Sequence, residues 1–315
     1  MKLRSILLAG ALMSGAATQS QMAAAQDENP GPLITTDVER EIVVSAQPDP
    51  EPQGREVNRQ ARSITVASNI FDEPLALFQS PVCPGVAGLP EELGNFIVDR
   101  IRYNTERAGL RLDEAGDCRV NLLVSFVIDG QSALQAMASD GNSLLAHIPV
   151  SEKRRLLNDS SPVHAWSVIS ERTRDGMPIR GRRELGMMPT INTQSANSLF
   201  LLPTRKDIEI SVVVIDIPAI DGMSAVQVAD YATMRGLVRT RPVTGDATYG
   251  TILNLFDEDS LHPSEMTTFD VAYVNAMYAN MPNIAGATKI GAVRGMMDRE
   301  IAATEAELEN YTRNE

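Results

Sequence analysis

The chain has 315 residues, of which 43% are hydrophobic, enough for one large or two small globular domains. Its formal net charge is −13, with 28 Lys and Arg against 41 Asp and Glu. An acidic chain of this kind offers no electrostatic attraction to nucleic acid or anionic lipid, so neither class of partner is expected.

The first 25 residues are predicted to be a secretory signal peptide. Lys2 and Arg4 precede an apolar run at 6–17 that is too short to cross a bilayer, and three alanines ending at Ala25 offer a cleavage site. Cleavage there removes the positive charges of Lys2 and Arg4 and takes the formal net charge from −13 to −15. We therefore expect an exported protein, periplasmic or secreted, without a transmembrane segment in the mature chain.

Residues 26–66 are predicted to be a disordered tail, because proline and acidic residues dominate and apolar content is low. One β-prone segment, EIVVSA at 41–46, interrupts this pattern. It resembles the short energy-coupling box near the N-terminus of TonB-dependent outer-membrane receptors. Alternatively, it is an incidental β-prone segment or an edge strand added to the folded domain.

Residues 67–284 are predicted to form one globular domain. A strand at 77–86, a helix at 91–108 and a strand at 120–128 have the order of a right-handed βαβ unit. Short helical patterns follow, and a hairpin is indicated around Arg174-Asp175-Gly176. These elements predict an α+β fold with α/β-like features, built on a single mixed sheet.

The centre of this domain is predicted to be a strand at 208–217 followed by a helix. The strand is β-branched and apolar on both faces, which is typical of a strand that is covered on two sides. Ser224 and Gln227 have the spacing of a capping box at the start of the helix. Gly236 is placed for a left-handed stop at its end. The last segment, 285–315, is predicted to be a C-terminal helix.

The two cysteines, Cys83 and Cys118, allow two interpretations. Export would permit a disulfide, which would close a loop of about 34 residues and stabilise the fold by roughly 3–4 kcal/mol. The alternative is two separate buried thiols.

The order of the elements resembles the catalytic domain of zincin metallopeptidases, in which a central helix carries HExxH before a Gly-Leu pair. Gly236-Leu237 matches that pair, and Phe269-Asp270 with Met277-Tyr278 match a later helix. This register implies that the metal ligands would fall on Ala229 and Thr233, and the general base on Asp230. Alanine and threonine are not effective zinc ligands. The resemblance therefore implies a degenerate scaffold without metal or cofactor.

Two further segments, PVCPGVAGLP at 81–90 and RYNTERAGL at 102–110, are similar to a family of uncharacterised exported proteins of Gram-negative bacteria. That resemblance implies an envelope location and no particular activity.

Two functions follow as hypotheses. The first is a non-catalytic binding or interaction module with a protein or small-molecule partner in the cell envelope. The alternative is a peptidase-like hydrolase whose site is assembled from distant residues. It would require His164 or His147 within hydrogen-bond reach of a carboxylate. The candidate carboxylates are Asp216 and Asp221, which flank the end of the central strand, and Asp230.

Overall fold

The computed structural model describes residues 54–179, 198, 201–243, 247–260 and 262–313. The predicted signal peptide and the segment at 41–46 lie outside these residues. All described residues belong to one compact unit.

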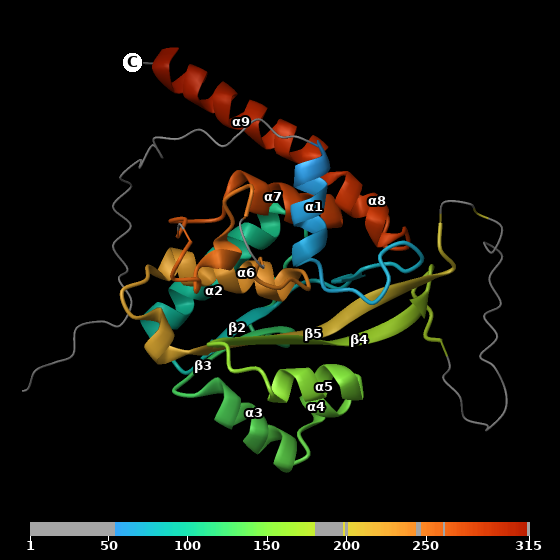
Figure 1. Ribbon diagram of the computed structural model, residues 1–315, viewed down its shortest axis with the longest axis vertical. Helices are drawn as coiled ribbons and strands as arrows, with labels where there is room; N and C mark the ends of the chain where they lie inside the picture. Colours follow the sequence, from blue (N-terminus) through green and yellow to red (C-terminus); the bar gives the residue numbers. More distant parts are fainter. Residues whose placement is uncertain (1–53, 180–197, 199–200, 244–246, 261, 314–315) are drawn as a thin grey trace, which may run out of the picture. The chain divides into compact units, whose positions relative to one another are not determined.

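Five strands of the described chain form one mixed sheet (Figure 1), which confirms the predicted fold class. β5 pairs in parallel with β3 and β1 along one side and antiparallel with β4 along the other, while β2 is parallel to β3. Within the described residues, β4 is therefore an edge of the sheet. The strands are β1 (Ala76–Leu77), β2 (Pro84–Ala87), β3 (Leu122–Val127), β4 (Val163–Thr173) and β5 (Thr204–Asp216).

β5 is the predicted central strand, and helices cover it on both faces. Val213 and Ile215 pack into the larger hydrophobic cluster, whereas Val212 and Val214 pack into the smaller one. This alternation explains the apolar run: each face of the strand has its own core to enter.

The helices divide between the two faces of the sheet (Figure 1). One face carries α3, α4 and α5, and the other carries α6 and the remaining helices. The bounds are α1 (Gly54–Ile64), α2 (Glu91–Arg107), α3 (Gly130–Ser139), α4 (Ser143–Ala146), α5 (Val150–Leu157), η1 (Ile217–Ile220), α6 (Ala225–Leu237), η2 (Ile252–Asn254), α7 (Thr268–Tyr278), α8 (Gly286–Gly291) and α9 (Val293–Arg313).

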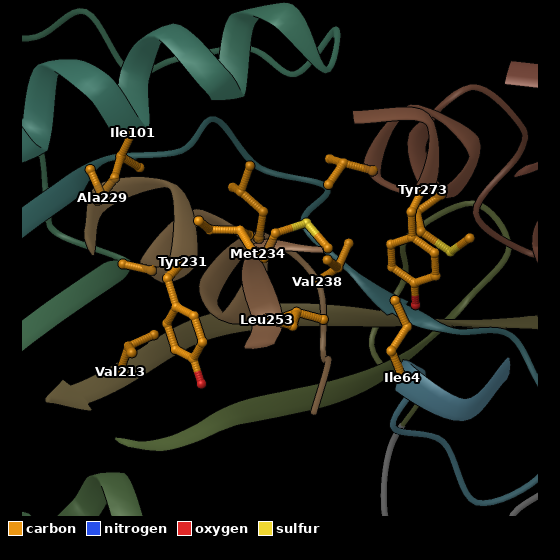
Figure 2. Packing of buried hydrophobic residues seen from close by; sticks show 14 of the residues in the cluster. Ile64, Ile101, Val213, Ala229, Tyr231, Met234, Val238, Leu253 and Tyr273 are labelled. Atoms are coloured by element: carbon orange, nitrogen blue, oxygen red, sulfur yellow. The ribbon is translucent and has the colours of Figure 1, made fainter. Parts of the chain in front are cut away.

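α6 is the most deeply buried helix, with every residue from Val228 to Leu237 buried. Figure 2 shows Ala229 facing Ile101 of α2, and Tyr231 pointing toward the sheet. The predicted capping box of Ser224 and Gln227 is present. Gly236, however, does not end the helix in a left-handed conformation. A Cβ at Gly236 would lie 3.2 Å from the Leu122 side chain, so the glycine allows close packing of α6 on β3.

Two domain boundaries differ from the sequence prediction. Residues 54–64, predicted to belong to a disordered tail, form α1, and the side chains of Val57, Ala61 and Ile64 are 0% exposed. Their i, i+4, i+7 spacing provides one narrow apolar stripe, which the polar composition of the segment concealed. The predicted C-terminal helix is divided into α8 and α9, and its buried residues, including Val293 and Met297, belong to the main core.

Cys83 and Cys118 form a disulfide with a Cα–Cα distance of 6.1 Å, so the bonded alternative is correct. It joins the start of β2 to the loop that precedes β3. No helix of the described residues has the length and apolar character needed to cross a membrane.

Candidate functional site

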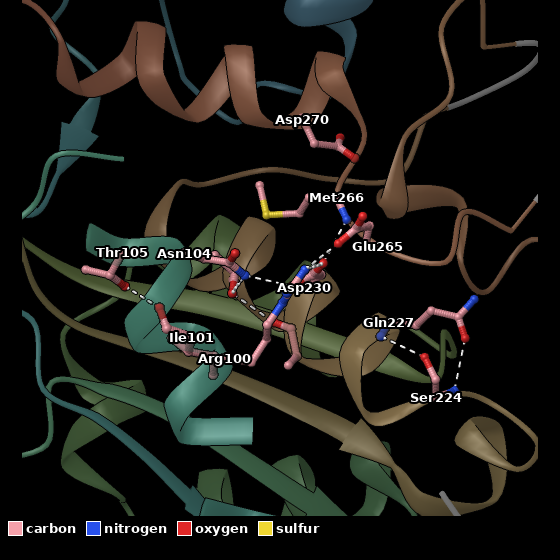
Figure 3. A network of polar contacts seen from close by, with 12 residues as sticks. Arg100, Ile101, Asn104, Thr105, Ser224, Gln227, Asp230, Glu265, Met266 and Asp270 are labelled. Carbon is pink, nitrogen blue, oxygen red and sulfur yellow. Dashed lines mark hydrogen bonds and ion pairs between the residues drawn. The ribbon is translucent and has the colours of Figure 1, made fainter. Parts of the chain in front are cut away.

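Asp230 of α6 lies at the centre of a buried polar network beneath α2 (Figure 3). Its carboxylate accepts hydrogen bonds from Arg100 Nε at 2.7 Å and Nη2 at 2.8 Å, from Asn104 Nδ2 at 2.7 Å and from the Met266 amide at 2.7 Å. Arg100 also donates to Glu265 at 3.0 Å. The hydrogen bonds to Asp230 raise the pKa of the Arg100 guanidinium above its ordinary value, so Arg100 stays charged.

This network contains the three positions that the zincin register would assign to a metal site. Ala229, Asp230 and Thr233 are all 0% exposed. The Thr233 hydroxyl donates to the Ala229 carbonyl at 2.8 Å and accepts from Asn104 at 3.2 Å. Asp230 thus ties α6 to α2 and to the segment before α7. Nowhere in the described part of the chain do three or more His, Cys, Asp or Glu side chains gather as a metal site would require.

His164 and Asp216 meet at the first residue of α3. The Gly130 amide donates to Asp216 Oδ1 at 2.6 Å, and a Cβ on Gly130 would lie 2.7 Å from both that oxygen and His164 Cδ2. His164 is 1% exposed, and neither ring nitrogen has a hydrogen-bond partner in the described residues. Burial lowers the pKa of His164, which favours the neutral imidazole.

The remaining candidates are separate from this pair. Asp221 is exposed on the turn after η1, and His147 and His262 are also exposed. The histidine–carboxylate hydrogen bond that a hydrolase would require is therefore not formed by His164 and Asp216 in this structure. Asp216 instead anchors the start of α3.

A cavity of about 480 Å³, which sequence reasoning did not predict, lies along the free edge of β4. Its wall includes Leu156 of α5 and Tyr231 and Arg235 of α6. Because α5 and α6 cover opposite faces of the sheet, a cavity lined by both must pass the sheet edge. Val163, Ala165 and Ser167 of β4 form that part of the wall.

Arg235 is the unusual residue of this cavity. The residue is 9% exposed, its Nη1 donates to the Tyr231 hydroxyl at 2.8 Å, and its guanidinium lies 5.7 Å from the centre of the Tyr231 ring. The buried Nε has no hydrogen-bond partner among the described residues, and no carboxylate there forms an ion pair with Arg235. A buried donor left unpaired costs about 1–3 kcal/mol.

The other charged residues of the wall already have partners or are exposed. Arg239 pairs with Glu152, and Arg241 Nε donates to the Ser63 carbonyl at 2.8 Å. Asp159 accepts from its own loop, and Arg155 is exposed. The unsatisfied charge of the cavity is therefore the buried guanidinium of Arg235.

The rest of the cavity wall offers apolar and aromatic surface. Tyr231 and Phe256 form an edge-to-face pair with ring centres 4.8 Å apart. Trp166 belongs to the smaller cluster, and its Nε1 donates to the Leu144 carbonyl at 3.3 Å. Among its described residues, the cavity therefore combines one buried cation without an ion-pair partner with a largely apolar wall.

Comparison of the chain with protein-family models, with curated proteins and with solved structures gives no match. The resemblances to zincins and to exported envelope proteins accordingly stay predictions.

Proposed function

We propose that this chain is an exported, non-catalytic binding module whose cavity beside β4 binds an anionic ligand with an apolar body. The observation that carries the proposal is Arg235, a buried guanidinium without an anionic partner that lines a cavity of about 480 Å³. Cavities of about 300–1,000 Å³ with apolar walls and a few fixed polar groups are typical of small-molecule sites.

The geometry of the guanidinium favours a carboxylate or phosphate group. Because Tyr231 occupies Nη1 and the Nε is fully buried, Nη2 is the guanidinium nitrogen that remains for a ligand. A guanidinium N–H donates a charge-assisted hydrogen bond to an oxygen of a carboxylate or a phosphate. Contact of the Tyr231 hydroxyl and ring with the guanidinium holds Nη2 in a fixed orientation.

The composition of the wall supports binding rather than acid–base catalysis. Its described residues include no histidine, cysteine or lysine, and the Ser161 hydroxyl donates to the Val163 carbonyl at 3.0 Å and not to a carboxylate. The disulfide supports the export part of the proposal, because disulfides persist in oxidising compartments.

Trp166 makes the proposal directly testable, because it is the only tryptophan of the chain and lines the cavity. We expect 4-phenylbutyrate and phenyl phosphate to change its fluorescence in a saturable manner. The neutral 4-phenylbutyramide should bind at least about tenfold more weakly, since a charge-assisted hydrogen bond contributes about 1.5–3 kcal/mol.

Substitution of the arginine separates a binding role from a structural one. Arg235→Met removes an unpaired buried charge, so it should abolish binding of both acids without lowering the midpoint of thermal unfolding. Arg154→Met, on the exposed face of α5, is the matched control and should bind normally. Undiminished acid binding by Arg235→Met, or no acid binding by the unmodified chain, would contradict the proposal.

A further inference from the structure

The structure also points to the class of ligand. We propose that the natural ligand is an extended peptide segment of another protein, which adds as a strand to the free edge of β4 and places a carboxylate on Arg235. This inference rests on the proposed function and assigns a partner to the same cavity.

The backbone of β4 presents alternate residues to the free edge of the sheet. The Asp216 amide donates to the Pro162 carbonyl at 2.9 Å, so Pro162 faces β5. In an antiparallel ladder the bonded pairs alternate, and the register is unbroken from Val163 to Val168. The backbone groups of Val163, Ala165 and Ser167 therefore point away from β5, toward the cavity that these residues line.

These outward groups are largely unpaired among the described residues. The Val163 carbonyl accepts from the Ser161 hydroxyl at 3.0 Å. Among the described residues, the amides of Val163, Ala165 and Ser167 form no backbone hydrogen bond, and neither do the carbonyls of Ala165 and Ser167. A row of free donors and acceptors repeating every second residue is the pattern that an added strand satisfies. A small acid would pair with Arg235 and leave this row unused.

The concave surface beside β4 extends beyond the first cavity. A second cavity of about 540 Å³ lies next to the first, shares Ser167 and the Arg239–Glu152 pair with it, and continues to Ile169. The two cavities follow β4 from Ser161 to Ile169, and the Arg239–Glu152 ion pair, which joins the segment after α6 to α5, lines both of them. At about 3.3 Å per residue this length corresponds to an extended segment of about eight residues, whose binding would displace that ion pair from the edge.

The walls beside β4 are apolar on both faces of the sheet. Alternate side chains of an added strand would point to opposite faces of the sheet. Those on one face would meet Tyr231 and Phe256, and those on the other would meet Leu156 and Trp166. The preferred segment is therefore apolar on both faces with one Asp, Glu or terminal carboxylate placed to reach Arg235.

A peptide pool tests the inference on the full chain. Peptides of about eight residues with one fixed Glu, and Ala, Val, Leu, Thr or Tyr elsewhere, are passed over the immobilised protein, beside the same pool with Gln. We expect retention of the Glu pool, with at least about tenfold weaker binding of Gln analogues of the recovered sequences.

Backbone chemistry then distinguishes strand addition from occupation of the cavity alone. N-methylation of the alternate amides that face β4 should weaken binding by at least about tenfold, whereas methylation of the other set should have little effect. Amide hydrogen exchange at Ala165 and Ser167 should slow when the peptide binds. Equal effects of the two methylation sets would overturn the inference.

A pair of substitutions at Ala165 gives an independent test. Ala165→Pro removes one outward amide donor, and an edge strand tolerates proline where the amide faces away from the sheet. It should lose peptide binding, while Ala165→Ser should retain it. If Ala165→Pro does not fold, Ser167→Pro removes the next outward donor.

The small acids and the peptides fail in distinguishable ways. If 4-phenylbutyrate binds through Arg235 but no peptide of the pool is retained, strand addition is wrong and the anionic small-molecule site stands. If neither binds, both proposals are wrong.

Discussion

Asp230 and Arg235 lie five positions apart on α6 and are both buried, but their environments are opposite. Asp230 accepts from four donors, whereas Arg235 has the Tyr231 hydroxyl as its only hydrogen-bond partner in the described residues. The carboxylate of Asp230 has all of its hydrogen bonds and links α6 to α2. The guanidinium of Arg235 lacks hydrogen-bond partners, and Arg235 lines a cavity, which is why the functional proposal rests on Arg235 and not on Asp230.

A substitution at Asp230 should show its structural role. Asp230→Asn leaves the Arg100 guanidinium without its buried counter-charge and should lower the free energy of unfolding by about 3–5 kcal/mol. Glu265→Gln removes the exposed partner of the same arginine and should cost less than about 1 kcal/mol. Urea unfolding of the two variants measures both values; equal, small losses would contradict this role.

Lys289 predicts a pH dependence. Its ammonium is buried and donates to the carbonyls of Met277 at 2.6 Å and Asn280 at 3.1 Å, and burial lowers its pKa from 10.5 to about 8. Between about pH 8 and pH 10.5 the Lys289 side chain is deprotonated in the native chain and still protonated in the unfolded chain. The free energy of unfolding should therefore rise with pH, by about 2 kcal/mol from about pH 8 to about pH 9.5.

Replacement of Lys289 tests that assignment. Lys289→Met should remove the rise in unfolding free energy across this pH range, and Lys153→Met on α5 should retain it. A rise of the same size in the Lys289→Met chain would assign the effect to other groups.

Sequence reasoning located several of these residues without predicting their partners. The spacing of Ser224 and Gln227 was sufficient to predict the helix start, because a capping box is local. The partners of Asp230 come from α2, 126 and 130 positions away, and from Met266. The sequence did not single out Arg235, since only the fold shows which cation lacks an anion.

Among the elements, α1 differs most from the sequence prediction. Its apolar stripe is only three residues wide, and flanking prolines and acidic residues dominate any composition window. Gln60 adds contacts that no local pattern reveals, because it exchanges hydrogen bonds with the backbone of Tyr249 at 2.8 and 2.9 Å. β5, in contrast, was predictable because both of its faces are apolar.

The contribution of α1 to stability can be measured with two substitutions on the same helix. Ile64→Ala creates a cavity at a fully buried side chain and should cost about 2–5 kcal/mol. Arg59→Ala, at an exposed position, should change stability by less than about 0.5 kcal/mol. If chemical unfolding gives the same small change in unfolding free energy for both variants, residues 54–64 do not pack as a helix on the core.

For the whole molecule, the mixed sheet with helices on both faces was predictable from the order of strands and helices, whereas the cavity was not. It depends on β4 being an edge strand and on α5 and α6 extending past it from opposite faces. Strand order and helix placement are tertiary properties, so no local spacing indicates the groove that they create.

The disulfide constrains the fold of the whole molecule. Cys83 and Cys118 close a loop that contains α2, and the double substitution Cys83→Ser with Cys118→Ser should lower the unfolding free energy by about 3–4 kcal/mol. Guanidinium unfolding of the double variant, compared with the oxidised chain, gives this difference. An unchanged midpoint would show that the loop is held by packing alone.

The most direct test of the central claim is the NMR signal of the Arg235 side-chain Nε–H group, identified by its loss in Arg235→Lys. If the guanidinium that carries this group is the anion receptor, addition of 4-phenylbutyrate should shift the signal in a saturable manner, and 4-phenylbutyramide should leave it in place. A signal that stays unchanged while the acid saturates the protein would contradict the account.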